Sequence, residues 1–427
     1  MIGSETERSS VRVNGSRNFL LAAALLLTLN LVVASWVLGT LGALLFLVGA
    51  VLALCRMECF GRGLWDRLLF GFLLLFGVAT VGLDGMYLLF GRFETWMVGV
   101  VLWLLVGMLL LFPAGNPVSF QLKRAQPWAF SAISVTASLL LLLLFFLART
   151  DIPLVSPWNL FGFEPFLLLG IAIFAAMFSA RERDDDLPMF VWMLVCLSAL
   201  SVSAIVYVVG FGFDPFLHRA AEQALVDTGV VEPVRLLYSG QYTLTAALHH
   251  LTAWPIKLID IWMVPIAASV WLPIVAIVGF ERGWNLSRRQ ARMWWIGIFA
   301  IPFMLATFTV PFTVTYVFFL GFMVAYPFFA RSNRLCFVTV LVALTAAVLF
   351  HPLLAVPMLL FFLGERFANL FSSPITKWMI AAGTAMAIGL SVPAMLAVAN
   401  ASWRALDIMR HLEYLPIYFR LFASPMR

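Results

Sequence analysis

Long apolar runs are the feature that most limits what this chain can fold into. A helix that crosses a membrane needs about 20 consecutive apolar residues, and runs near this length recur along the whole chain. Only 11% of the 427 residues are charged, against about 25% in ordinary soluble domains, which excludes a soluble globular fold. Charged residues and clusters of Gly and Pro bound these runs and predict spans at 18–38, 40–55, 68–90, 96–113, 129–148, 164–180, 189–210, 259–280, 293–308, 311–330, 335–350, 352–364 and 378–399.

The predicted fold class is therefore all-α, a polytopic membrane protein with about 13 transmembrane helices. Residues 335–364 form one apolar stretch that is too long for a single comfortable span. It is interrupted by Phe350-His351-Pro352, and because proline disfavours helix at the residue before it, we expect a tight hairpin or kink at His351. We divide the chain into a six-span region, 1–187, and a seven-span region with a C-terminal tail, 188–427.

The basic residues are distributed unevenly between the two predicted sides of the membrane. With the N-terminus in the cytoplasm, the inner segments up to residue 334 carry sixteen Lys and Arg residues, and the outer segments carry only five: Arg92, Arg149, Arg219, Arg235 and Lys257. Cytoplasmic loops are enriched in Lys and Arg, so we predict a multi-pass plasma-membrane protein with a cytoplasmic N-terminus. The net charge of +6 is then a consequence of topology, and no nucleic-acid partner is expected.

One predicted outer loop, residues 211–258, is far longer than the other outer connections. Within it, 217–227 and 243–251 have helical spacing, and the second segment follows a predicted turn at Tyr238-Ser239-Gly240-Gln241. Long ordered loops often carry functional residues. All five histidines of the chain fall on this predicted side, which indicates a reaction compartment at the outer face, although interfacial helices also hold histidines without catalytic roles.

Asp214 is the leading candidate in this loop. It follows the seventh span and lies among aromatic residues, where a carboxylate is costly unless it is paired or bound to a metal. The structural alternative is that Asp214 begins the next helix, with Pro215 in its first turn. Both interpretations are compatible with each other.

Other acidic residues are weaker candidates. Asp84 and Asp260 lie near the outer ends of the third and eighth spans, where acids are functional suspects but are also close enough to water to be solvated. The run Asp184-Asp185-Asp186 is interpreted as a solvated cytoplasmic connector. Three loop acids could complete a site with Asp214 but are interpreted mainly as surface charges: Glu222, Asp227 and Glu232.

The segment GFDPFLHRAAE, residues 212–222, resembles the first outer loop of membrane glycosyltransferases of the GT-C class, which use polyprenyl-phosphate-linked sugars. In that class a span ends in an acidic motif, two loop helices lie along the membrane surface, and six further spans follow. This chain resembles that order over about residues 189–400, as a GT-C-like module in its C-terminal half. The segment Tyr238–Tyr242 and the pair His351-Pro352 also resemble features of bacterial and archaeal members.

The resemblance implies that Asp214 is the general base, or a ligand of Mg²⁺ or Mn²⁺, that activates the acceptor at the extracytoplasmic face. It implies further catalytic roles for His218 and His351. Substrate binding is implied for Arg219, Arg235, Tyr238, Gln241 and Lys257. The implied partners are a polyprenyl-phosphate-linked sugar donor, membrane lipid, and a glycan, lipid or protein acceptor. The WWDYG sequence of the oligosaccharyltransferase subunit is absent, so transfer of a single sugar is implied rather than protein N-glycosylation.

Two other classes of function are compatible with the topology. A transporter or lipid flippase would account for the many spans and for Asp84, but transporters often show internal repeats, and none is evident here. A non-catalytic membrane scaffold would account for residues 1–187, which contain few polar residues. The polar residues gather at the predicted outer rim instead, which favours the glycosyltransferase.

Overall fold

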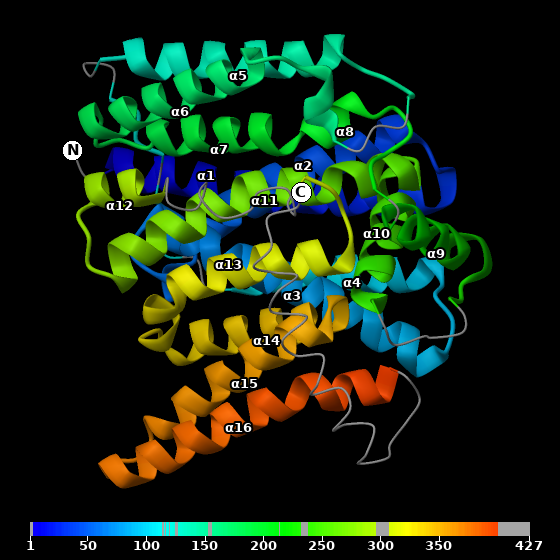
Figure 1. Ribbon diagram of the computed structural model, residues 1–427, viewed down its shortest axis with the longest axis vertical. Helices are drawn as coiled ribbons and strands as arrows, with labels where there is room; N and C mark the ends of the chain where they lie inside the picture. The colour runs from blue at the N-terminus through cyan, green and yellow to red at the C-terminus, as the bar shows by residue number, and fades with distance from the viewer. Residues whose placement is uncertain are drawn as a thin grey trace. The chain divides into compact units, whose positions relative to one another are not determined.

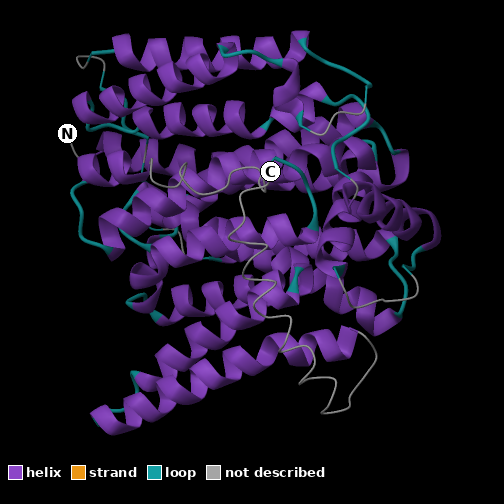
Figure 2. Ribbon diagram, viewed as in Figure 1, coloured by secondary structure: helices purple, strands orange, loops and turns teal. Residues whose placement is uncertain are grey.

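The computed structural model describes residues 3–112, 115, 117–118, 120–123, 127–152, 156–212, 214–231, 238–295 and 307–399. Within these residues all regular structure is helical, apart from one isolated bridge between Thr150 and Tyr207 (Figure 2). The chain divides into two units, the first ending at Phe350 and the second beginning at His351. His351 has an extended backbone between two helices, which confirms the predicted interruption of the apolar stretch. The predicted division at residue 187 stays a prediction.

The first unit is a bundle of helices that lie alongside one another (Figure 1). Its described helices are α1 Gly3–Val33, α2 Trp36–Leu54, α3 Leu64–Phe90, α4 Thr95–Leu111, α5 Ala129–Leu147, α6 Glu164–Glu182, α7 Leu187–Leu200, α8 Val202–Val206, α9 Asp214–Thr228, α10 Ser239–Thr252, α11 Ile256–Val278, α12 Arg288–Trp294, α13 Pro311–Ala330 and α14 Arg334–Phe350. Short 3-10 turns lie at Glu58–Phe60 and Pro157–Leu160, and one π-helical turn, Gly279–Gly283, follows α11. The second unit contains α15, Pro352–Ala368, which packs against α16, Pro374–Ala399.

Eight of the described helices are long and apolar enough to cross a membrane, by length and composition: α1, α2, α3, α5, α6, α11, α13 and α16. Helices α4, α7 and α14 are apolar but shorter. The predicted span at 293–308 falls largely on residues 296–306, which lie outside the described residues. The protein is therefore an all-helical protein with several candidate membrane spans, and the count of 13 stays a prediction.

Apolar side chains on the outside of the bundle explain why the sequence shows little helical amphipathicity. Val32 is 85% exposed, Leu89 is 78% exposed and Leu147 is 74% exposed. In water such a surface would be unfavourable, whereas a spanning helix must satisfy its backbone internally and can face lipid with any apolar side chain. These exposed apolar side chains therefore identify surfaces that are suited to the hydrocarbon of a membrane.

Helix α10 is held in the bundle by two glycines that permit close helix approach. A Cβ atom at Gly39 of α2 would lie 2.5 Å from Cα of Thr252, the last residue of α10. A Cβ atom at Gly240 would lie 2.9 Å from Cδ2 of Phe350 in α14. Small residues at such positions let neighbouring backbones pack closely within a membrane. Both ends of α10 are thereby fixed against the apolar helices.

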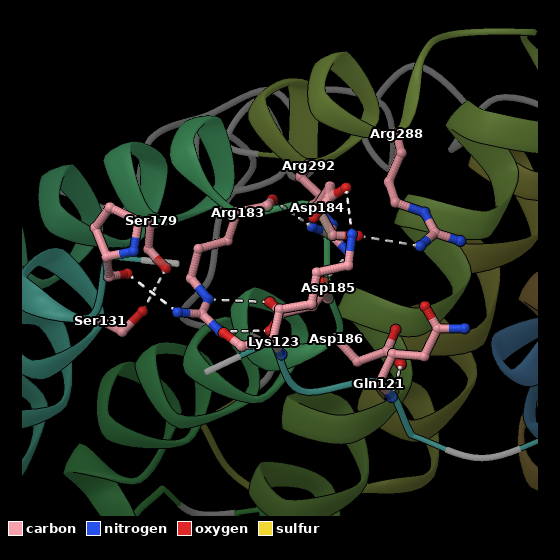
Figure 3. Close-up of polar contacts among 11 residues, drawn as sticks. Gln121, Lys123, Ser131, Ser179, Arg183, Asp184, Asp185, Asp186, Arg288 and Arg292 are labelled. Atoms are coloured by element: carbon pink, nitrogen blue, oxygen red, sulfur yellow. Dashed lines mark hydrogen bonds and ion pairs between the residues drawn. The ribbon is translucent and has the colours of Figure 1, made fainter. Parts of the chain in front are cut away.

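A polar cluster joins the end of α6, the beginning of α7 and α12 (Figure 3). These helix ends lie at the end of the first unit away from α9 and α10 (Figure 1). Arg183 and Asp185 form an ion pair with fully buried side chains, and the Arg183 guanidinium also donates to the carbonyl oxygens of Pro127 and Lys123. Arg292 donates to the carbonyl oxygens of Arg183 and Asp185. Buried charges require this degree of pairing and hydrogen bonding.

This cluster shows that the interpretation of residues 184–186 as a solvated connector is wrong. Asp184 is exposed and pairs with Lys123, but Asp185 and Asp186 are buried. Asp186 accepts hydrogen bonds from the indole of Trp65 and from the backbone N–H of Gln121. The acidic run therefore ties three chain segments together. A run of like charges shows no periodicity, so its sequence does not reveal which carboxylates turn inward.

Candidate functional site

Helices α9 and α10 lie side by side at one end of the first unit (Figure 1). They confirm the two loop helices that the sequence predicts at 217–227 and 243–251, and each extends beyond the predicted range at both ends. Gly210 and Gly212 precede α9 with φ angles of 123° and 82°, which lets the chain turn sharply into the helix. Asp214 and Pro215 begin α9, as the structural interpretation of that pair expects.

The predicted turn at Tyr238–Gln241 is instead the beginning of α10. Tyr238 adopts a left-handed backbone, with φ of 66°, and the helix starts at Ser239. Gly240 and Ser239 favour a turn in isolation, but their contacts with other helices override this preference. Gly240 packs against α14, and the Ser239 hydroxyl donates a 2.7 Å hydrogen bond to Asp84 of α3.

Asp84 anchors α10 to α3. Its carboxylate is fully buried and accepts hydrogen bonds from the hydroxyls of Ser239, at 2.7 Å, and Thr243, at 3.0 Å. These two residues are one helical turn apart, so they present their hydroxyls on the same face of α10. One interpretation of its position expected Asp84 to be solvated at the interface. That interpretation is wrong, because the carboxylate is buried.

We expect Thr243→Val to destabilise the protein by about 1–3 kcal/mol, because the isosteric change removes a hydrogen bond from a buried carboxylate. Thermal unfolding of the detergent-solubilised protein measures the effect. Thr345→Val is the matched control, since Thr345 is exposed and its hydroxyl donates to the carbonyl oxygen of Leu341 in its own helix. Equal melting temperatures for the two variants would show that the hydrogen bond from Thr243 to Asp84 does not contribute to stability.

A second buried pair joins α9 to α11. The Arg219 guanidinium donates two hydrogen bonds to Oδ2 of Asp260, at 3.0 Å from Nε and 2.9 Å from Nη2. It also lies over the ring of Phe216, at 5.2 Å from the centroid. The Asp260 side chain is 1% exposed and that of Arg219 is 15% exposed, so the carboxylate is shielded from solvent and its cation is partly buried. Arg219, for which the resemblance implies substrate binding, thus has a structural partner in Asp260.

Glu222 is the residue whose predicted environment differs most from its place in the structure. It is fully buried rather than a surface charge, and its Oε1 accepts hydrogen bonds from Gln241 Nε2, at 2.8 Å, and Thr245 Oγ1, at 3.1 Å. Burial raises the pKa of Glu222 well above its ordinary value, and the negative charge of Asp260 adds to this effect. The signal in the sequence was spacing. The buried residues of α9 are Pro215, Glu222 and Leu225, and their separations of seven and three residues place them on one helix face.

His218 and Asp214 form the accessible part of the site. His218 Nδ1 shares a 2.8 Å hydrogen bond with the Tyr242 hydroxyl, and the imidazole meets the ring of Tyr238 edge to face at 5.2 Å. Burial lowers the pKa of His218, and the nearby charge of Asp214 partly opposes this shift. The imidazole is therefore neutral near pH 7 and able to take up a proton. Asp214 is exposed, one turn earlier on the same helix.

The structure thus brings together five of the predicted site residues: Asp214, His218, Arg219, Tyr238 and Gln241. Lys257 lies exposed in the first turn of α11, and Arg235 lies outside the described residues. His351 belongs to the second unit, where it precedes α15.

The described residues do not by themselves build a metal centre. Within that part of the chain, no three His, Cys, Asp or Glu side chains are grouped so that they could hold a metal ion. Asp214 would offer a single carboxylate, and Mg²⁺ is usually held by one or two carboxylates together with water and substrate phosphates. The Mg²⁺ or Mn²⁺ ion stays a prediction.

An apolar cavity of about 310 Å³ lies next to α10 inside the first unit. All its lining residues are apolar, and they come from α2, α3, α10, α11, α13 and α14. From α10 the cavity is lined by Leu244 and Leu248, whereas Gln241 and Thr245 of the same helix bind Glu222. These four residues are spaced i, i+3, i+4 and i+7, so the polar contacts and the lining of the apolar cavity lie along the same face of α10. Comparison of the chain with protein-family models, curated proteins and solved structures found no match.

Proposed function

We propose that this protein is a membrane glycosyltransferase that moves a sugar from a polyprenyl-phosphate-linked donor to an acceptor at the extracytoplasmic face. The observation that carries the proposal is the double role of α10, which presents polar residues to α9 and lines an apolar cavity with Leu244 and Leu248. A lipid-linked sugar needs such a pair of environments, because its tail is apolar and its phosphate and sugar are polar. The GT-C-like segment around Asp214 supports the same assignment.

In the proposed reaction the acceptor hydroxyl attacks the anomeric carbon of the donor sugar. The Asp214 carboxylate takes the hydroxyl proton, a new C–O bond forms, and the bond between the sugar and the phosphate breaks. The electron pair leaves with the phosphate. The neutral imidazole of His218 lies in the field of Asp214 and offers a second proton acceptor. A basic residue such as Lys257 or Arg235 is proposed to bind the donor phosphate, as the resemblance implies.

A proton-coupled transporter or flippase is the second candidate function. The buried carboxyl groups of Asp84, Glu222 and Asp260 favour it, since buried acids in membrane proteins often mark ion or proton pathways. The hydrogen bonds of Asp84 and the ion pair of Asp260 account for two of these groups as structural anchors. The glycosyltransferase accounts in addition for the exposed Asp214.

The proposal is tested in membranes that contain the full chain, supplied with radiolabelled polyprenyl-phosphate-linked monosaccharides. We expect transfer of label, and we expect Leu244→Trp to lower transfer at least about tenfold, because excluding two apolar methylenes of the donor tail costs more than about 1.4 kcal/mol. Leu217→Trp is the control, since Leu217 is 56% exposed on α9. Solute uptake without any transfer of label would favour the transporter, and equal transfer by both variants would remove the cavity from the mechanism.

A further inference from the structure

Two buried oxygen atoms between α9 and α10 lack a hydrogen-bond donor within the described residues. They are Oε2 of Glu222 and Oε1 of Gln241, and both side chains are 0% exposed. The other polar atoms of these two side chains, Gln241 Nε2 and Glu222 Oε1, form a hydrogen bond of 2.8 Å, in which the amide donates. Since an ionised carboxylate and an amide oxygen both only accept hydrogen bonds, neither atom can satisfy the other. Leaving two buried acceptors unsatisfied is costly.

We propose that Glu222 is a proton-binding site, in which a carboxylic acid and the Gln241 amide form a cyclic pair with two hydrogen bonds. In this pair the amide N–H donates to one acid oxygen, as observed, and the acid O–H donates to the amide oxygen. One proton therefore satisfies both unpartnered atoms. Thr245 Oγ1, which donates to Oε1 of Glu222 at 3.1 Å, is compatible with a neutral acid.

The charges that face Glu222 favour the same protonation state. Arg219 is the nearby cation, and its Nε and Nη2 atoms are both engaged by Asp260 of α11. From α10 the neighbouring titratable group is Tyr242, which bonds to His218. Ionised Glu222 would thus be a second negative charge beside Asp260, with one guanidinium between them. Burial and this repulsion are what raise the pKa of Glu222.

The bound proton ties α9 to α10 and gives the fold a predictable dependence on pH. The unfolded chain has an ordinary glutamic acid, with a pKa of about 4.3, and the folded chain binds its proton more tightly. The contribution to stability is therefore complete below the unfolded pKa and is lost as the pH rises through the folded pKa. Above that pH the hydrogen bond from the acid to the Gln241 amide oxygen is lost, and the link between α9 and α10 is weaker. This inference does not depend on the proposed function.

Glu222→Gln tests the site, because glutamine has the shape of the neutral acid and can form the same cyclic pair with Gln241. The measurements are melting temperature against pH and infrared difference spectra of the detergent-solubilised full chain. We expect the variant to match the wild type at neutral pH, to exceed it at alkaline pH, and to lack one protonated-carboxyl band that the wild type retains at neutral pH. Glu94→Gln is the control, since Glu94 is an exposed partner of Arg92, and it should change none of these.

An ionised Glu222 gives the opposite results. Glu222→Gln would then lower the melting temperature at neutral pH, and no protonated-carboxyl band would disappear. If Glu222→Gln does not fold, Gln241→Leu decides the question, because removal of the amide partner should shift the frequency of the Glu222 acid band. An infrared spectrum in which Gln241→Leu shifts no acid band at neutral pH would overturn the proposal.

Discussion

Arg219→Leu is expected to destabilise the protein by about 3–5 kcal/mol, because it leaves the carboxylate of Asp260 buried without its cation. Asp260 is 1% exposed and receives two hydrogen bonds from Arg219. Glu222 lies close enough to Asp260 for their charges to interact, so the loss of Arg219 also removes a cation that acts on both carboxyl groups. The midpoint of thermal or denaturant unfolding in detergent measures the loss.

Two further variants separate the ion pair from general effects of mutation. Arg219→Leu combined with Asp260→Leu should recover most of the stability, because replacing a whole buried ion pair by apolar residues is often neutral. Arg92→Leu removes an exposed partner of Glu94 and should cost less than about 1 kcal/mol. If Arg219→Leu costs no more than Arg92→Leu, the pair does not hold α9 to α11.

The sequence is sufficient to predict features that depend on local periodicity and on backbone chemistry. The two loop helices follow from the spacing of apolar residues, and the beginning of α9 follows from Asp214 and Pro215. The helix break at His351 follows from the proline after it. Each of these features is determined by residues within one or two helical turns, so the rest of the fold does not change the outcome.

The errors concern side chains whose environment is determined by another helix. Glu222 is buried because Gln241 and Thr245 of α10 are positioned to receive it, and Asp185 is buried because Arg183 and Arg292 surround it. Ser239 and Gly240 were expected in a turn but lie in α10, because they contact Asp84 and Phe350. The spacing of Pro215, Glu222 and Leu225 indicates the buried face of α9, but no local pattern identifies partners on other helices, such as Gln241 and Arg292.

The second large effect concerns catalysis. We expect Asp214→Asn to lower sugar transfer by about 10²–10⁴-fold. Asparagine keeps the shape of the side chain but cannot take the proton from the hydroxyl group of the acceptor. Asp214 is exposed at the start of α9, so the cost to stability should be limited to the interaction of its charge with the helix dipole, about 0.3–1 kcal/mol. A large loss of transfer with little change in the melting temperature is therefore the expected signature.

Asp227→Asn is the matched control for this variant. Asp227 is a second exposed aspartate of α9, and it receives a hydrogen bond from Gln223 on the same helix. It lies near the end of α9 remote from Asp214, so its replacement removes the same charge from the same helix without changing the proposed base. Wild-type transfer by this variant would show that net charge alone does not explain the effect of Asp214→Asn.

The central claim is that a base at the start of α9 drives sugar transfer from a lipid-linked donor. The most direct measurement is the initial rate of label transfer from polyprenyl-phosphate-linked monosaccharides in membranes with equal amounts of wild type, Asp214→Asn and Asp227→Asn. The account predicts transfer by the wild type and by Asp227→Asn, and a rate at least about 100-fold lower for Asp214→Asn. A wild-type rate for Asp214→Asn, or no transfer by the wild type from any of these donors, would contradict it.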